Sequence, residues 1–127
     1  MLVGVTILTG MHLVYQLVTL VHLVGFATLL GGCVIQLRVL DPEVNLPMLV
    51  GAWTQVASGL VLAGLLELAG DPTQPVNHAK LGVKLGIALI VLLLAAKNRK
   101  FQSIPRGLWT LITGLVLLNA GVAVLWS

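Results

Sequence analysis

Histidine and lysine side chains occur in this sequence inside stretches that are otherwise apolar. His22 stands between "VTLV" and "LVGF", and His78, Lys80 and Lys84 fall at the start of the apolar stretch "HAKLGVKLGIALIVLLLA". Hydrocarbon penalises ionisable groups by several kcal/mol unless they have partners or water, so such residues are candidates for function. All four are therefore candidate cofactor-binding residues.

The two histidines could ligate a metal. Neutral imidazole is a good ligand for iron, and paired histidines on different helices can hold haem b inside a helical bundle. A shift of the sequence by 56 residues aligns His22 with His78 and Trp53 with Trp109, which indicates two pseudo-repeated helical hairpins. Such a repeat places both histidines at the same depth. We therefore predict that His22 and His78 are metal ligands, with haem b as the cofactor.

Helical spacing separates the lysines from His78. Lys80 and Lys84 share one helix face, whereas His78 lies about 200° around the helix from Lys80. Two arrangements remain open. Either His78 faces the bundle and the lysines extend to the outer surface, or the lysines face a polar pocket and His78 is peripheral. Porphyrin propionates, or the acids Glu67 and Asp71, are the expected partners of the lysines.

The composition indicates that membrane helices position these residues. Of the 127 residues, 58% are apolar and only 9% are charged, against about 25% charged in soluble domains. The net charge of +3 is typical of lysines and arginines that set topology, and it does not indicate a nucleic-acid partner. The single Cys33 and the absence of Cys/His clusters argue against an internal disulfide, iron–sulfur, structural zinc and c-type haem sites.

Four apolar stretches are long enough to cross the bilayer core, which takes about 20 residues. Breaks that contain proline separate them, and they lie at about 13–39, 48–68, 76–96 and 106–126. Residues 1–12 lack the basic start of a signal peptide, so we expect an extension of the first span or an interfacial segment. The predicted fold is all-α: a single transmembrane domain over 1–127, forming an integral membrane four-helix bundle.

Basic residues predict the orientation of the bundle. The 97–106 loop carries four lysines and arginines, and the loop after the first span carries Arg38. We expect these two loops to lie on the same, cytoplasmic side of the cell (inner) membrane. Both termini then lie outside.

Small residues four positions apart recur along the predicted spans, and this spacing lets helices approach closely. Gly82 and Gly86 in the third span have it. We expect them to line a helix contact, so that a bulky residue at Gly82 lowers stability. A cofactor pressed against these glycines is the alternative.

Two stretches resemble a known family. "VHLVGFATLLGGCVIQLR" resembles the first-helix signature of the membrane protoporphyrinogen oxidase family and of the copper-resistance-D-like four-helix membrane proteins. His22, Gly32 and Arg38 match its offsets of ten and sixteen residues. "NHAKLGVKLGIALIVL" is similar to the family's "WLHAKL" helix start, with His78 and Lys80 in the histidine and lysine positions.

The resemblance implies a protein that binds haem b and acts in electron transfer or in oxidation of a porphyrin-type substrate. It implies that His22 and Lys80 are essential, although Asn77 stands where the family usually has a tryptophan. The alternative is a non-catalytic accessory subunit that packs against a larger membrane complex. A homo-oligomer is also possible in either case. A small multidrug exporter is excluded because its type needs a membrane-embedded acid in the first span, which has none.

Overall fold

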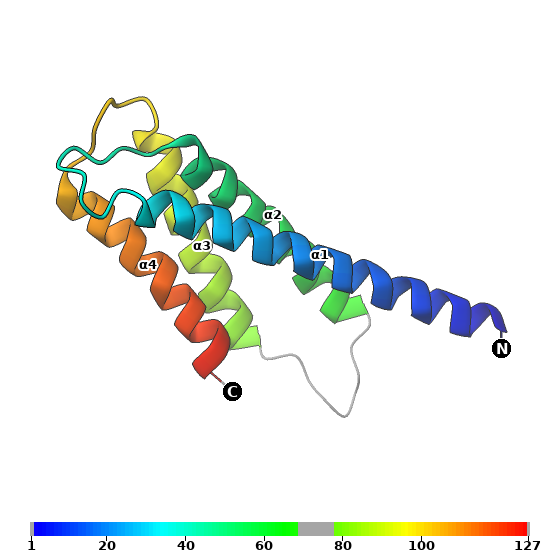
Figure 1. The fold of residues 1–127 in the computed structure, drawn as a ribbon. Helices are drawn as coiled ribbons and strands as arrows, with labels where there is room; N and C mark the ends of the chain where they lie inside the picture. Colours follow the sequence, from blue (N-terminus) through cyan, green and yellow to red (C-terminus); the bar gives the residue numbers. More distant parts are fainter. Residues whose placement is uncertain (1, 69–77, 127) are drawn as a thin grey trace.

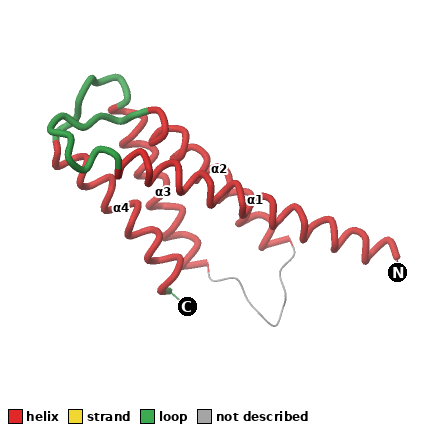
Figure 2. The backbone as a smooth tube through the Cα atoms, viewed as in Figure 1, coloured by secondary structure: helices red, strands yellow, loops and turns green. Residues whose placement is uncertain are grey.

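Four helices make up the part of the chain that the computed structural model describes, residues 2–68 and 78–126 (Figure 1; Figure 2). In chain order these are α1 (Leu2–Val34), α2 (Leu46–Leu68), α3 (His78–Asn98) and α4 (Arg106–Leu125). Each contains a stretch long and apolar enough to cross a membrane. The predicted all-α, four-helix membrane bundle is therefore confirmed.

The first helix differs most from its predicted span. It begins at Leu2, so residues 2–12 continue the helix, and its candidate membrane-crossing part is His12–Val34. It ends at Val34 and not near residue 39. Beyond that point the backbone N–H groups of Gln36 and Leu37 bond to carbonyls three residues back, which makes turns instead of a continued helix.

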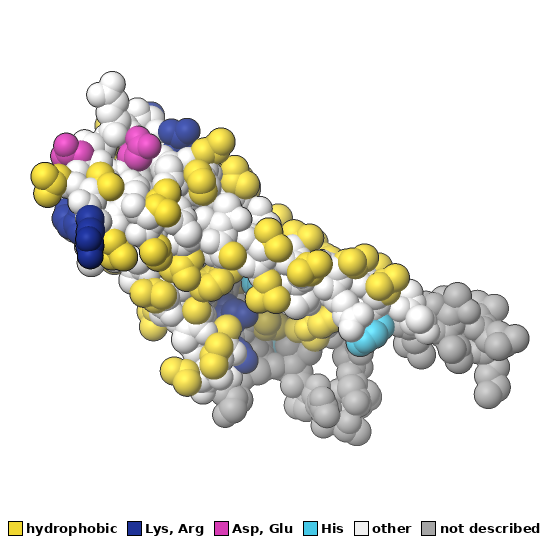
Figure 3. Space-filling model, in the orientation of Figure 1, with side chains coloured by type: hydrophobic (Ala, Val, Ile, Leu, Met, Phe, Trp, Pro, Cys, Tyr) yellow, Lys and Arg dark blue, Asp and Glu magenta, His cyan; other side chains and the backbone are white. Residues whose placement is uncertain are grey.

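The helices pack as neighbours along the chain. In Figure 1, α1 runs along α2, and α3 lies beside α4, while the first turns of α1 project beyond the other helices. The helix α4 also touches α1, but over the described residues no close backbone contact joins α1 to α3. Large apolar side chains such as Leu13, Leu17 and Leu20 are exposed. Hydrophobic side chains are spread over the face of the molecule that Figure 3 shows. Such faces suit contact with lipid.

The core lies toward the end of the bundle where the loops 35–45 and 99–105 meet, here called the loop end. Fully buried side chains there include Val44, Met48 and Ile112. Close approach of α1 and α2 gives the core its shape. A Cβ added at Gly51 would lie 2.5 Å from the backbone nitrogen of Leu29, so only glycine fits that crossing.

The prediction that Gly82 and Gly86 line a helix contact is wrong. A Cβ at either position would meet no other atom within 4 Å, whereas Gly25, Gly32 and Gly51 on α1 and α2 have close neighbours. The spacing of small residues recurs throughout this glycine-rich chain. Spacing alone therefore does not identify which of these faces packs.

Hydrogen bonds tie the loop end together. The guanidinium of Arg106 donates to the backbone carbonyls of Leu37 and Val39. The N–H of Ile104 donates to the carbonyl of Pro42 at 2.7 Å. The two loops predicted to share one side therefore lie together, and charged side chains gather there (Figure 3).

Candidate functional site

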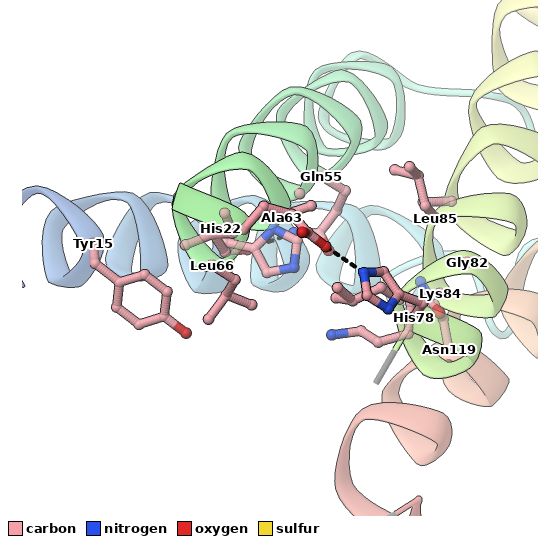
Figure 4. A pocket seen from close by; sticks show the side chains of 15 residues that line it. Tyr15, His22, Gln55, Ala63, Leu66, His78, Gly82, Lys84, Leu85 and Asn119 are labelled. Carbon is pink, nitrogen blue, oxygen red and sulfur yellow. Dashed lines mark hydrogen bonds and ion pairs between the residues drawn. The ribbon is translucent and has the colours of Figure 1, made fainter. Parts of the chain in front are cut away.

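A cavity of about 280 Å³ opens between the helices in the half of the bundle away from the loop end (Figure 4). Small residues leave this space, because Gly59, Ala63, Gly82 and Ala88 line it. Its volume is near the lower end of the range for small-molecule sites, about 300–1,000 Å³. We call it the His22 cavity.

Polar and ionisable side chains stand among the apolar ones that line the His22 cavity. All four helices contribute, and the polar lining residues are Tyr15, His22, Gln55, Glu67, His78, Lys84 and Asn119. The histidines on α1 and α3 that the sequence singled out therefore border one space. Polar groups at membrane depth are costly, and they commonly mark functional sites.

His22 is held by α2 in one tautomer. Its Nδ1 lies 2.6 Å from Ser58 Oγ, and Ser58 Oγ lies 2.5 Å from the carbonyl oxygen of Thr54. The single hydroxyl proton of Ser58 goes to that carbonyl, because a carbonyl oxygen can only accept a hydrogen bond. Ser58 must then accept from Nδ1–H. In the neutral ring this leaves the lone pair on Nε2.

A second bond fixes the backbone at the same place. The side-chain amide of Gln55 donates to the backbone carbonyl of His22. Gln55 is buried, and its side chain also lines the His22 cavity. The position and the ring orientation of His22 are thus both set by α2.

His78 Nε2 and Glu67 Oε1 are hydrogen-bonded at the edge of the cavity (Figure 4). Their side chains are 73% and 54% exposed. The sequence predicted Glu67 as a partner of Lys80 or Lys84, and the structure places His78 against it instead of Lys84, because His78 opens α3 directly beside the end of α2. Asp71 lies outside the described residues.

The two arrangements predicted for the lysines are each only partly right. Lys84 is half-buried and lines the cavity together with His78, whereas Lys80 is not among the lining residues. The angle between His78 and Lys80 on the helix does not decide the position of Lys84. The long Lys84 side chain brings its amine to a space that His78 borders from the start of α3.

Asn119 was missed by reasoning from the sequence. Its Oδ1 is buried and has no hydrogen-bond partner among the described residues. The side chain lines the His22 cavity and, with Gln55, a small adjoining space. A signal was present, since Asn119 is the only amide side chain in the fourth apolar span.

The histidines do not form a metal site by themselves. Within residues 2–68 and 78–126, no group of three or more His, Cys, Asp or Glu side chains is placed to hold a metal ion. A metal bound at His22 would need most of its ligands from a cofactor, as iron has in a porphyrin.

Comparison with known proteins adds no relative. No protein-family model, no curated protein and no solved structure matches the chain. The function is therefore argued from the chemistry of the His22 cavity.

Proposed function

We propose that this membrane protein binds haem b in the His22 cavity, with Nε2 of His22 as an axial ligand, and acts in electron transfer or porphyrin-type oxidation. The observation that carries the proposal is the bond from His22 Nδ1–H to Ser58. Histidine ligands of metals are held in this way, with one nitrogen bonded and the other nitrogen left to bind the metal. The resemblance of the sequence around His22 to a haem-binding family agrees with this.

Other features of the cavity fit a flat cofactor. A side chain is missing at Gly82, where a Cβ would point into open space. His78 borders the same cavity, so His78 or a lysine would be the second residue that holds the cofactor. Bound haem would supply one-electron chemistry. The chain itself holds the imidazole and surrounds the cofactor with apolar side chains such as Leu62 and Leu85.

We also propose that the loop end faces the cytoplasm of a cell (inner) membrane, with both termini outside. Five of the seven lysines and arginines belong to the loop end or its flanking helix turns, and the other two are Lys80 and Lys84. An excess of basic residues is the usual mark of the cytoplasmic side. The His22 cavity then lies in the outer half of the bundle.

An absorption spectrum of the purified protein tests haem binding. We expect the detergent-solubilised protein, as isolated or after addition of haem b, to show a Soret band that shifts on reduction. His22→Ala should lower the haem content at least about tenfold, because it removes the axial nitrogen. His12→Ala is the matched control, because His12 lies on the same helix, is exposed and is not among the lining residues.

Two results would contradict the proposal: no haem bound by the native protein, or full haem content in His22→Ala. A colourless protein that purifies with a larger membrane complex would favour the accessory-subunit alternative. His78→Ala, Lys80→Ala and Lys84→Ala then identify the second ligand. The variant that retains haem but has a changed spectrum identifies the residue that supplies the second ligand.

A further inference from the structure

Lys84 is a polar group of the His22 cavity that iron ligation by His22 does not explain. It lies in α3, within a candidate membrane span, and is half-buried. No hydrogen bond or ion pair joins its amine to another residue of the described ranges. Figure 4 shows the Lys84 side chain extended into the cavity, away from the helix that carries it.

The acid that lines the cavity contacts a different residue. Glu67 is the one carboxylate among the cavity-lining residues, and it is paired with His78. Among the described residues, no carboxylate therefore lies within ion-pair distance of the Lys84 amine.

A second observation points to a ligand at the same place. Asn119, on α4, has a buried and unpaired side-chain oxygen and lines the same cavity. An amide can turn to present either its oxygen or its NH₂ group. Asn119 can thus bond an acid group in its protonated or its ionised form. The helices α3 and α4 therefore contribute polar groups that nothing among the described residues satisfies.

We propose that the His22 cavity selects ligands that carry a free carboxylate, and that Lys84 binds this carboxylate. The inference rests on the proposed function for the identity of the ligand, since haem b carries two propionates. It adds that binding depends on the acid group and not only on the iron. Charge-assisted bonds between an ammonium and a carboxylate are among the strong ones, more so away from water.

The test compares haem b with its dimethyl ester, in which both propionates are blocked but the iron is unchanged. Each is titrated into the detergent-solubilised protein, and binding is followed by the Soret band. We expect the native protein to prefer the free acid by about tenfold or more. Lys84→Gln should lose this preference without weaker binding of the ester, and Lys84→Arg should keep it.

Two other lysines of α3 serve as controls. Lys97→Gln removes a charge at the loop end and should leave the preference unchanged. Lys80→Gln should also leave most of it, because Lys80 is not among the lining residues. Equal binding of acid and ester by the native protein, or a preference that depends on Lys80 and not on Lys84, would overturn the inference while haem binding stands.

If neither haem form binds, the proposed function fails and a second pair of probes tests the carboxylate site alone. A long-chain fatty acid and its methyl ester are then compared by calorimetry. Binding of the acid that is lost in Lys84→Gln and kept in Lys97→Gln supports the site. Equal binding of both probes, or of neither, contradicts it.

Discussion

Ser58 decides which nitrogen of His22 is available to a ligand. Its hydroxyl gives its proton to the carbonyl of Thr54 and accepts the proton of His22 Nδ1. Groups that orient a metal-binding histidine in this manner raise affinity by about 10–100-fold. The ligand-binding strength of the cavity is therefore expected to depend on a residue that itself is not among those lining it.

We predict that Ser58→Ala weakens haem binding by about 10–100-fold while the protein stays folded. The imidazole loses the acceptor that fixes its tautomer, and Nδ1 competes with Nε2 for the proton. Haem titration and thermal unfolding measure the two effects separately. Thr110→Ala is the control, since that hydroxyl bonds only within its own helix, to Arg106. Unchanged affinity in Ser58→Ala would show that the tautomer does not matter.

Residue type alone identified part of this site. His22, His78 and Lys84 were found because ionisable groups are rare in apolar spans. Ser58 could not be found, because a helical serine commonly bonds its own backbone, as Ser58 also does. Only the crossing of α1 over α2 places its hydroxyl beside His22. The predicted ligand roles of the histidines remain predictions.

The crossing of α1 and α2 depends on glycine at the point of contact. We predict that Gly51→Ala destabilises the protein by about 1–3 kcal/mol, because the added methyl would overlap the backbone at Leu29. Thermal unfolding in detergent measures it. Gly114→Ala is the matched control, since a Cβ there meets nothing within 4 Å. Equal unfolding temperatures for the two variants would contradict the close approach.

At the scale of whole helices, the sequence predicted that four helices exist, but it placed some of their ends wrongly. Apolar runs of spanning length define the ends of α2, α3 and α4 to within two residues. The end of α1 was misplaced because Ile35 and Leu37 are as apolar as the helix before them. The amide of Gln36 turns the chain there by bonding across the turn to Glu43. The hydropathy of the sequence does not reveal that hydrogen bond, so it could not predict where the helix ends.

The orientation of the whole molecule is open to a labelling experiment. In intact cells, we predict that a membrane-impermeant thiol reagent labels Trp126→Cys but labels Gln102→Cys only after permeabilisation. The reason is the excess of basic residues at the loop end. The native Cys33 is fully buried and serves as an unreactive background. The reverse labelling pattern would invert the proposed orientation and leave the bundle unchanged.

The bonds of Arg106 hold the bundle together at the loop end. At the other end of the bundle, α1 and α3 share no close contact over the described residues. The His22 cavity lies between them. From Val34 to His22 the helix rises about 18 Å. A rotation of α1 by roughly 5° about the loop end therefore moves it away from α3 by about 1.6 Å at His22. Such a rotation would widen the described walls of the His22 cavity and leave the bonds of Arg106 at the loop end unbroken.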